Sequence, residues 1–272
     1  MSEIFDRVKQ NAKRFPDKSA IIDGNGNAKT YSQLVQRVEI RIHQLLGAVT
    51  PSLTRVALCL EDGCELPTTV LALNALRVPI IPLNTRLQSD QILHLLKSVD
   101  ANLVIIDSTN TRLFQGINKS INCVDVNELR RTTKIGNGYA PNLKGSEEYK
   151  QFLISLSSGS TGNPKPIVLS EKNKLDRSEQ MISLYDICSD DVILCASPFF
   201  HTLGQRLTLL PLLVGSTLIQ LTRFTAKTWS DAVYDHRVTF TIPVSSHLHE
   251  LVEPMLATPN RFSSLRCIVS SS

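Results

Sequence analysis

The chain has 272 residues, and its 29 lysines and arginines outnumber its 25 aspartates and glutamates to give a net charge of +4. Hydrophobic residues make up 42% of the sequence and charged residues 20%, with 12 glycines and 13 prolines. This composition excludes collagen-like, low-complexity and disulfide-scaffold proteins. The charges alternate in sign and form no basic block, which argues against a nucleic-acid-binding surface. A chain of this length can bury the core of one large or two modest domains.

The N-terminal region predicts a hairpin followed by a helix. The first residues lack a basic stretch followed by an apolar one, so no secretory signal is expected. Residues 23–26, Asp-Gly-Asn-Gly, are typical of a hairpin turn. Apolar residues at helical spacing then run over 31–45, and Thr30 with Gln33 three positions later forms a capping box in front of them.

Short runs rich in valine, isoleucine and leucine alternate with segments of helical period along the rest of the chain. The expected strands are 55–60, 79–82, 103–106, 152–156, 192–195, 217–220, 238–242 and 265–269. Further helices are expected over 87–99, with Ser89 near the start, and after Ser170. Continuous apolar strands that alternate with helices predict the α/β class, with parallel sheets flanked by helices.

Two further segments and the cysteines indicate how the domains are organised and where the protein is located. The polar stretch 127–150 predicts a surface excursion or a soft internal boundary between two sets of strands and helices. The uncharged run 207–222 is too short and too interrupted to span a bilayer, so we expect a buried helix followed by a strand. The six cysteines show no CxxC pair, which favours reduced thiols in a cytoplasmic protein and gives no metal site.

The most informative segment is a hydroxyl- and glycine-rich loop after the strand expected over 152–156. It contains Ser157, Ser158, Gly159, Ser160, Thr161, Gly162 and Lys165. Such a loop, at the carboxyl end of a strand, offers backbone amides, hydroxyls and one positive charge to a polyphosphate. Its spacing matches neither a Walker loop nor a nucleophile elbow. Taken alone, a loop of this composition is also consistent with a polar connection that binds nothing.

The complete string 157–165 resembles the phosphate-binding signature of the adenylate-forming (AMP-binding) superfamily, of the acyl-CoA synthetase and acyl-AMP ligase type. Pro166 departs from that signature, which usually has glycine there. The resemblance continues with Thr-Tyr-Ser-Gln-Leu at 30–34, Ile-Pro-Leu-Asn at 81–84, Ser-Pro-Phe-Phe-His-Thr-Leu-Gly at 197–204 and Thr-Ile-Pro at 241–243. The fold it implies is a large N-terminal adenylation domain of αβαβα type, here partial over residues 1–272.

The resemblance implies ATP-dependent activation of a carboxylic acid to an acyl-adenylate, followed by transfer to CoA or a carrier-protein thiol. The loop residues would hold ATP, and Lys165 and His201 would be catalytic. Phe200, His201, Gly204 and His247 would contact the acid, although a structural role for His247 is equally open. His247 and His249 point about 200° apart on a helix, so they do not share a metal.

Superfamily enzymes are about twice this length, and the segments that bind Mg²⁺, adenine and ribose have no match in this chain. The resemblance therefore implies an amino-terminal portion, an excised piece or interrupted frame that is inactive without a C-terminal half or a complementing subunit. The alternative is a catalytically incompetent fragment that serves as a nucleotide-binding or interaction module.

Overall fold

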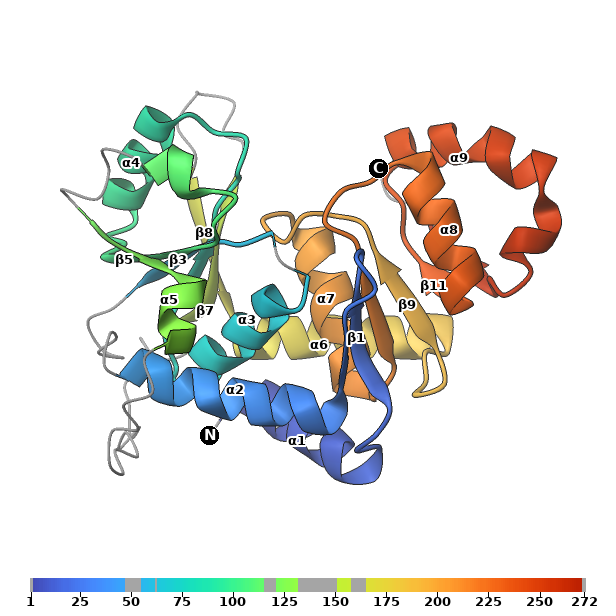
Figure 1. Cartoon of the computed structure of the whole chain (residues 1–272), viewed down its shortest axis with the longest axis horizontal. Coiled ribbons are helices and arrows are strands. Elements are labelled where there is room, and N and C mark those ends of the chain that lie inside the picture. Colours follow the sequence, from blue (N-terminus) through green and yellow to red (C-terminus); the bar gives the residue numbers. More distant parts are fainter. Residues whose placement is uncertain are drawn as a thin grey trace. The chain divides into compact units, whose positions relative to one another are not determined.

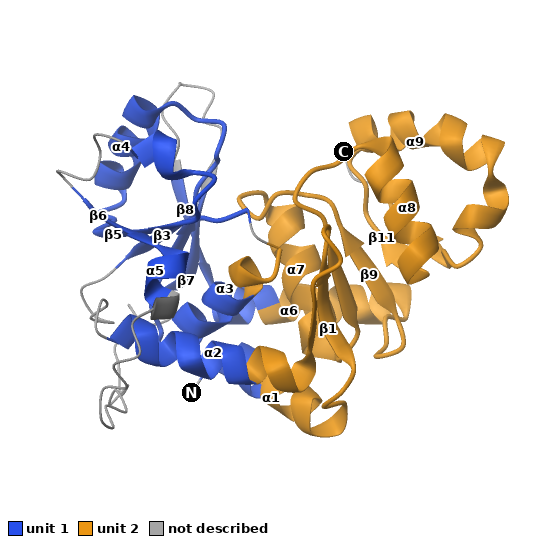
Figure 2. Ribbon diagram, in the orientation of Figure 1, with its two compact units in different colours: residues 1–6, 36–61, 68–174 blue, residues 7–35, 62–67, 175–272 orange. Residues whose placement is uncertain are grey.

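The computed structural model describes residues 2–46, 55–61, 63–114, 121–131, 151–157 and 165–270, with the backbone only at 130, 131, 156, 157 and 165. The chain forms two compact units (Figure 2). Unit 1 contains residues 1–6, 36–61 and 68–174, and unit 2 contains residues 7–35, 62–67 and 175–272. The boundary expected near 127–150 is not one of these divisions. It stays a prediction, because most of it lies outside the described residues.

Unit 1 is built on a six-stranded sheet in the order β6-β5-β3-β4-β7-β8 (Figure 1). All neighbouring strands are parallel except β7 and β8, which are antiparallel. The strands are β3 (Val56–Cys59), β4 (Ile80–Pro82), β5 (Leu103–Ile106), β6 (Asn122–Asp125), β7 (Gln151–Ser157) and β8 (Lys165–Ser170).

Unit 2 is built on a second six-stranded sheet in the order β12-β11-β9-β10-β1-β2. Its strands are parallel except for the β1–β2 hairpin, which confirms the turn predicted at residues 23–26. The strands are β1 (Ser19–Asp23), β2 (Ala28–Thr30), β9 (Val192–Cys195), β10 (Thr217–Gln220), β11 (Phe240–Thr241) and β12 (Cys267–Ile268).

The helices fall between the strands, as the alternating pattern predicts. They are α1 (Glu3–Arg14), α2 (Tyr31–Leu46), α3 (Glu65–Ala75), α4 (Ser89–Ser98), α5 (Val126–Arg131), α6 (Glu171–Tyr185), α7 (Thr202–Val214), α8 (Ala226–His236) and α9 (Ser245–Ala257), with 3₁₀ turns at Thr111–Phe114 and Pro259–Phe262. The predicted α/β class is therefore confirmed. None of the described helices is long and apolar enough to cross a membrane.

The predicted helix starts are confirmed for α2 and α6, whereas the start predicted for α4 is wrong by two residues. The Thr30 hydroxyl accepts from the Gln33 amide, and the Gln33 side chain accepts from the Thr30 amide, which closes the capping box of α2. Asn173 and Ser170 cap α6 in the same way. Helix α4 begins at Ser89 and not at Leu87, because Gln88 occupies the cap position and pairs with Gln91.

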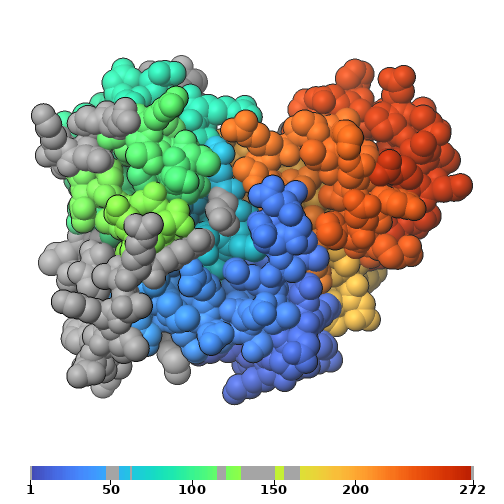
Figure 3. Space-filling view, viewed as in Figure 1, coloured from blue at the N-terminus to red at the C-terminus, as the bar shows by residue number. Residues whose placement is uncertain are grey.

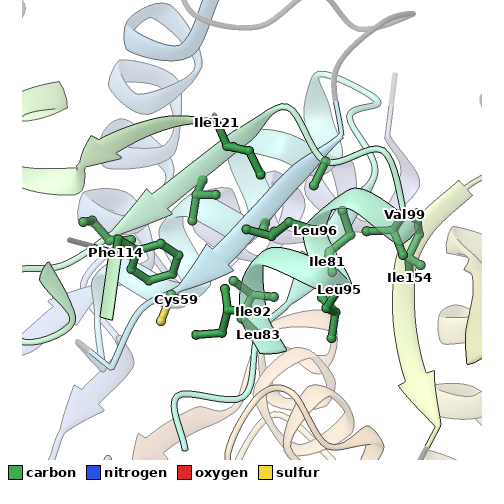
Figure 4. Close-up of a cluster of buried hydrophobic side chains, with 14 residues drawn as sticks. Cys59, Ile81, Leu83, Ile92, Leu95, Leu96, Val99, Phe114, Ile121 and Ile154 are labelled. Carbon is green, nitrogen blue, oxygen red and sulfur yellow. The ribbon is translucent and has the colours of Figure 1, made fainter. Parts of the chain in front are cut away.

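The core of unit 1 is a cluster of buried hydrophobic side chains whose spacing along the chain follows the periods of strands and helices (Figure 4). Alternate residues of β3 and β5 face one cluster, while α4 contributes side chains spaced three and four apart to the same cluster. Its members include Ala57, Cys59, Val104, Ile106, Ile92, Leu95, Leu96, Val99 and Phe114. Full burial of each large aliphatic side chain stabilises the fold by about 1.5–3 kcal/mol.

A buried carboxylate ties together the strands of unit 2. Asp191, at the start of β9, accepts two hydrogen bonds from Arg266, at 2.8 and 2.7 Å, and one from the Thr239 hydroxyl at 2.6 Å. Thr239 also accepts from the Val192 amide. Burial acts to raise the pKa of Asp191, but the hydrogen bonds from Arg266, Thr239 and the Cys188 amide outweigh it and lower that pKa.

We predict that Asp191→Asn lowers the free energy of unfolding near neutral pH by about 1.5–3 kcal/mol, since it removes charge-assisted hydrogen bonds. A carboxylate with a lowered native pKa stabilises the fold above its unfolded pKa of about 3.9, and this contribution is lost as the pH falls through the native pKa. Urea unfolding at several pH values should therefore show a shallower loss of stability below about pH 4 in the variant. Asp190→Asn, at an exposed neighbouring site, is the control; an equal effect there would contradict the assignment.

Candidate functional site

The loop predicted to bind phosphate connects β7 to β8 in unit 1. Strand β7 is parallel to β4, so the loop leaves the sheet at the carboxyl end of a parallel strand, where open α/β sheets bind ligands. Its two ends are directly opposite each other, because Ser157 pairs with Lys165 across the antiparallel ladder. Ser158, Gly159, Ser160, Thr161 and Gly162 lie outside the described residues, and the side chains of Ser157 and Lys165 are not described, so their roles stay predictions.

Strand β8, which follows the loop, accommodates Pro166 and is held at its carboxyl end by Glu171. Pro166 lies in β8, an edge strand, where a missing backbone donor is tolerated. Immediately after β8, the buried Glu171 carboxylate accepts from Arg77 Nη1 and from the Ser2 hydroxyl, both at 2.7 Å, and from the Ile4 amide at 3.0 Å. These bonds hold the end of β8 within unit 1.

In unit 2, three segments that carry histidine or phenylalanine side chains follow neighbouring strands and lie at the same edge of the sheet. Residues 196–201 follow β9, residues 221–225 follow β10, and residues 242–247 follow β11. The strand order β11-β9-β10 and the parallel pairing place all three carboxyl ends side by side. His201, Phe224 and His247 are carried by these three segments.

His201 occupies a tight turn at the start of α7. Its amide donates to the Pro198 carbonyl at 3.0 Å, and its own carbonyl accepts from the Gln205 amide at 3.0 Å. The imidazole is exposed and lies against the Phe200 ring, with centroids 4.4 Å apart. The structure therefore brings together the predicted His201 and Phe200 and leaves the imidazole accessible.

Gly204 is required by the close approach of α7 to this turn. A Cβ at Gly204 would lie 2.1 Å from the Pro198 carbonyl oxygen and 2.6 Å from the Ser197 carbonyl oxygen. Both contacts are with backbone, which cannot move aside cheaply. Gly204 thus shapes the turn that carries His201, and its predicted contact with an acid stays a prediction.

His247 is partly buried beside the ring of Phe224, a residue that the sequence pattern alone does not identify as part of the site. The His247 and Phe224 rings stack with centroids 3.6 Å apart and an interplanar angle of 5°. His247 Nδ1 is buried without a hydrogen-bond partner among the described residues. Burial lowers the pKa of His247, against the opposing effect of Glu250, so the neutral imidazole is favoured at neutral pH. The sequence signal for Phe224 is its position, an aromatic residue just after a buried strand.

α9 continues from this stack onto the surface of unit 2. The α8–α9 region, orange to red in Figure 3, is open to solvent on the face drawn there. His249 is exposed, whereas His247 packs against Phe224. No group of three or more histidines, cysteines or acidic residues that could hold a metal gathers among the residues the structure describes.

Both units have a mainly parallel sheet with helices between the strands, so the chain is an α/β protein. In such proteins, ligands bind at the carboxyl ends of the strands. The chain matches the AMP-binding enzyme family over residues 8–272 and belongs to that family. It is 25% identical over 247 residues to the 2-succinylbenzoate–CoA ligase of Geobacillus sp. (strain WCH70), covering 89% of this chain and 48% of that ligase.

Solved structures share the fold at low sequence identity. The inhibitor-bound N-terminal domain of FACL13 from Mycobacterium tuberculosis has a TM-score of 0.89 at 20% identity, covering 99% of this chain and 70% of that one. ATP-bound MatB from Rhodopseudomonas palustris has a TM-score of 0.85 at 21% identity, covering 100% of this chain and 55% of that one. The chain spans about half the length of the curated CoA ligases that it matches.

We predict that Gly204→Ala destabilises unit 2 by about 1–3 kcal/mol or more, because the added methyl group collides with backbone oxygens. Gly24→Ala is the matched control, since its Cβ would meet Leu221 at an ordinary 3.5 Å. Chemical denaturation of both variants measures the difference. Equal stabilities of the two variants would show that α7 does not pack this closely on the turn.

Proposed function

We propose that this chain is the amino-terminal, nucleotide-binding part of an AMP-forming acid–thiol ligase. In the first step a carboxylate oxygen attacks the α-phosphorus of ATP, the bond from that phosphorus to the bridging oxygen breaks, and pyrophosphate leaves. In the second step a thiol sulfur attacks the acyl carbon, and AMP leaves with the carboxylate oxygen. Membership of the AMP-binding enzyme family supports this proposal.

The observation that carries the proposal is the position of the string 157–165. Its first and last residues end β7 and begin β8, so that the loop leaves the sheet at the carboxyl end of β7. Amides and hydroxyls of residues 157–162 are proposed to donate to the β- and γ-phosphates, with Thr161 and Lys165 the principal contacts. In phosphoryl-type chemistry, positioning and charge stabilisation supply most of the rate enhancement.

The acid is proposed to bind to residues of unit 2. His201 offers an exposed imidazole for the reacting carboxylate, and Phe200 offers an apolar surface beside it. His247, neutral and stacked on Phe224, suits contact with the less polar part of the acid. The relatives' names point to CoA as acceptor and to acids such as 2-succinylbenzoate, and a carrier-protein thiol is the second candidate acceptor. Cytoplasmic location agrees with the six cysteines, none of which forms a disulfide in the part of the chain that the structure describes.

We infer that these 272 residues alone bind ATP weakly at most and do not sustain turnover, because the related ligases are about twice as long. Calorimetry with ATP tests binding, and ATP–pyrophosphate exchange with a panel of carboxylic acids tests turnover. Robust exchange by the chain alone would overturn the inferred inactivity. Failure to bind ATP, even with the C-terminal half of a related ligase supplied, would overturn the proposed function and favour an interaction module.

We predict that Lys165→Ala weakens ATP binding about 10- to 100-fold, which corresponds to the loss of a charge-assisted bond of about 1.5–3 kcal/mol. Titration calorimetry of the purified variant measures this change. Lys172 is exposed on the first turn of α6, seven positions after Lys165. Lys172→Ala also removes one positive charge and should leave ATP affinity within about twofold of the parent value. Unchanged ATP affinity in Lys165→Ala would remove this residue from the phosphate site.

A further inference from the structure

A buried polar cluster lies beneath the turn that carries His201. It consists of Cys195 and Thr208, which are both fully buried, and Gln220, which is 5% exposed. The same face of β9 and β10 carries the buried Ile193 and Leu218, two positions before Cys195 and Gln220, and α7 carries the buried Leu212 one turn after Thr208. Polar groups in such surroundings are costly unless they bond one another, so the cluster needs a structural explanation.

The topology brings the three residues together. Cys195 is the last residue of β9, Gln220 is the last residue of β10, and the two are direct partners in the parallel register. Their side chains therefore point to the same face of the sheet. Helix α7 packs on both strands and supplies Thr208, which is one turn beyond Gly204 and on the same side of the helix.

Hydrogen-bond geometry links the cluster to both ends of the turn. The Thr208 hydroxyl donates to Gln220 Oε1 at 3.0 Å. Cys195 Sγ lies 3.9 Å from Thr208 Oγ1, 3.4 Å from the Ser197 carbonyl oxygen and 3.8 Å from the Gly204 carbonyl oxygen. The two carbonyls flank His201 in the sequence, one on each side. A single thiol thus contacts the backbone where the chain enters the turn and where α7 begins.

The protonation state of Cys195 agrees with this arrangement. Burial raises the pKa of its thiol above the ordinary value, against the smaller opposing effects of its hydrogen-bonding neighbours Ser197, Thr208 and Gln220. The sulfur therefore keeps its proton at neutral pH, and its single S–H can donate to the Ser197 carbonyl, the nearer of the two. A hydrocarbon side chain at this position would leave that carbonyl without this donor.

We propose that Cys195, Thr208 and Gln220 are positioning residues that hold the 197–204 turn and thereby orient His201. This assignment rests on the proposed function for the use made of His201, but the orientation itself is a property of unit 2. The thiol acts on the turn directly, and the Thr208–Gln220 bond keeps the polar partners of the thiol in place.

The test is amide hydrogen exchange at His201 in the 272-residue chain, since this amide donates to the Pro198 carbonyl. Cys195→Ala should speed exchange at His201 about fivefold or more relative to amides of β10, as expected for the loss of about 1 kcal/mol of local hydrogen bonding. Cys195→Ser retains a donor and should restore exchange to within about twofold of the parent. Thr208→Val should act in the same direction as Cys195→Ala.

Cys59→Ala is the matched control. Cys59 is also fully buried and also ends a parallel strand, β3, but it belongs to unit 1. The control should leave relative exchange at His201 unchanged, even where it lowers overall stability. If Cys195→Ala and Cys59→Ala changed His201 exchange equally, or if Cys195→Ser failed to restore it, the proposal would be overturned.

A second measurement separates orientation from general loosening. With ¹³C-labelled histidine, Cys195→Ala should shift the His201 imidazole resonance, while Cys195→Ser and Cys59→Ala should leave it in place. An unmoved resonance in Cys195→Ala contradicts the proposal. Neither readout needs ATP or turnover, so a failure of ATP binding would overturn the proposed function alone.

Discussion

Strands that are buried on both faces impose the constraint on which the rest of this structure depends. Such strands pair in parallel, and each needs a crossover, usually helical, before the next. Crossovers begin at carboxyl ends, so the polar loops after β9, β10 and β11 gather at one edge of the sheet in unit 2. The apolar character of short segments thus determines where His201, Phe224 and His247 lie.

Hydrogen-bonded anchors away from that edge keep the loops in register. Asp191 and Arg266 join the starts of strands in unit 2, and Glu171 holds the end of β8 in unit 1. The Cys195 cluster is of a different kind, because it lies directly under a loop. The anchors stabilise the scaffold, whereas the cluster, as proposed above, acts on one turn.

The sequence predicts most of this fold and the chemical character of the site, but not its contacts. All eight predicted strands are present within two residues at each end, because short runs rich in valine, isoleucine and leucine that alternate with helical segments are typical of strands. Helix α1 is absent from the prediction although its buried Ile4, Phe5 and Val8 lie at helical spacing. Strand β6 lacks an apolar run, because it begins with an exposed asparagine and has no fully buried residue. The Phe224–His247 stack and the Cys195 cluster depend on strand order and register, which a one-dimensional pattern does not contain.

Hydrogen exchange with mass spectrometry can show whether the hairpin of β7 and β8 holds the phosphates of ATP, as we propose. Saturating ATP should slow exchange in the peptide covering 151–170 and leave the peptide covering β5 unchanged. Slower exchange over 151–170, with β5 unchanged, would support ATP binding at this hairpin. Unchanged exchange over 151–170 with ATP bound would contradict it.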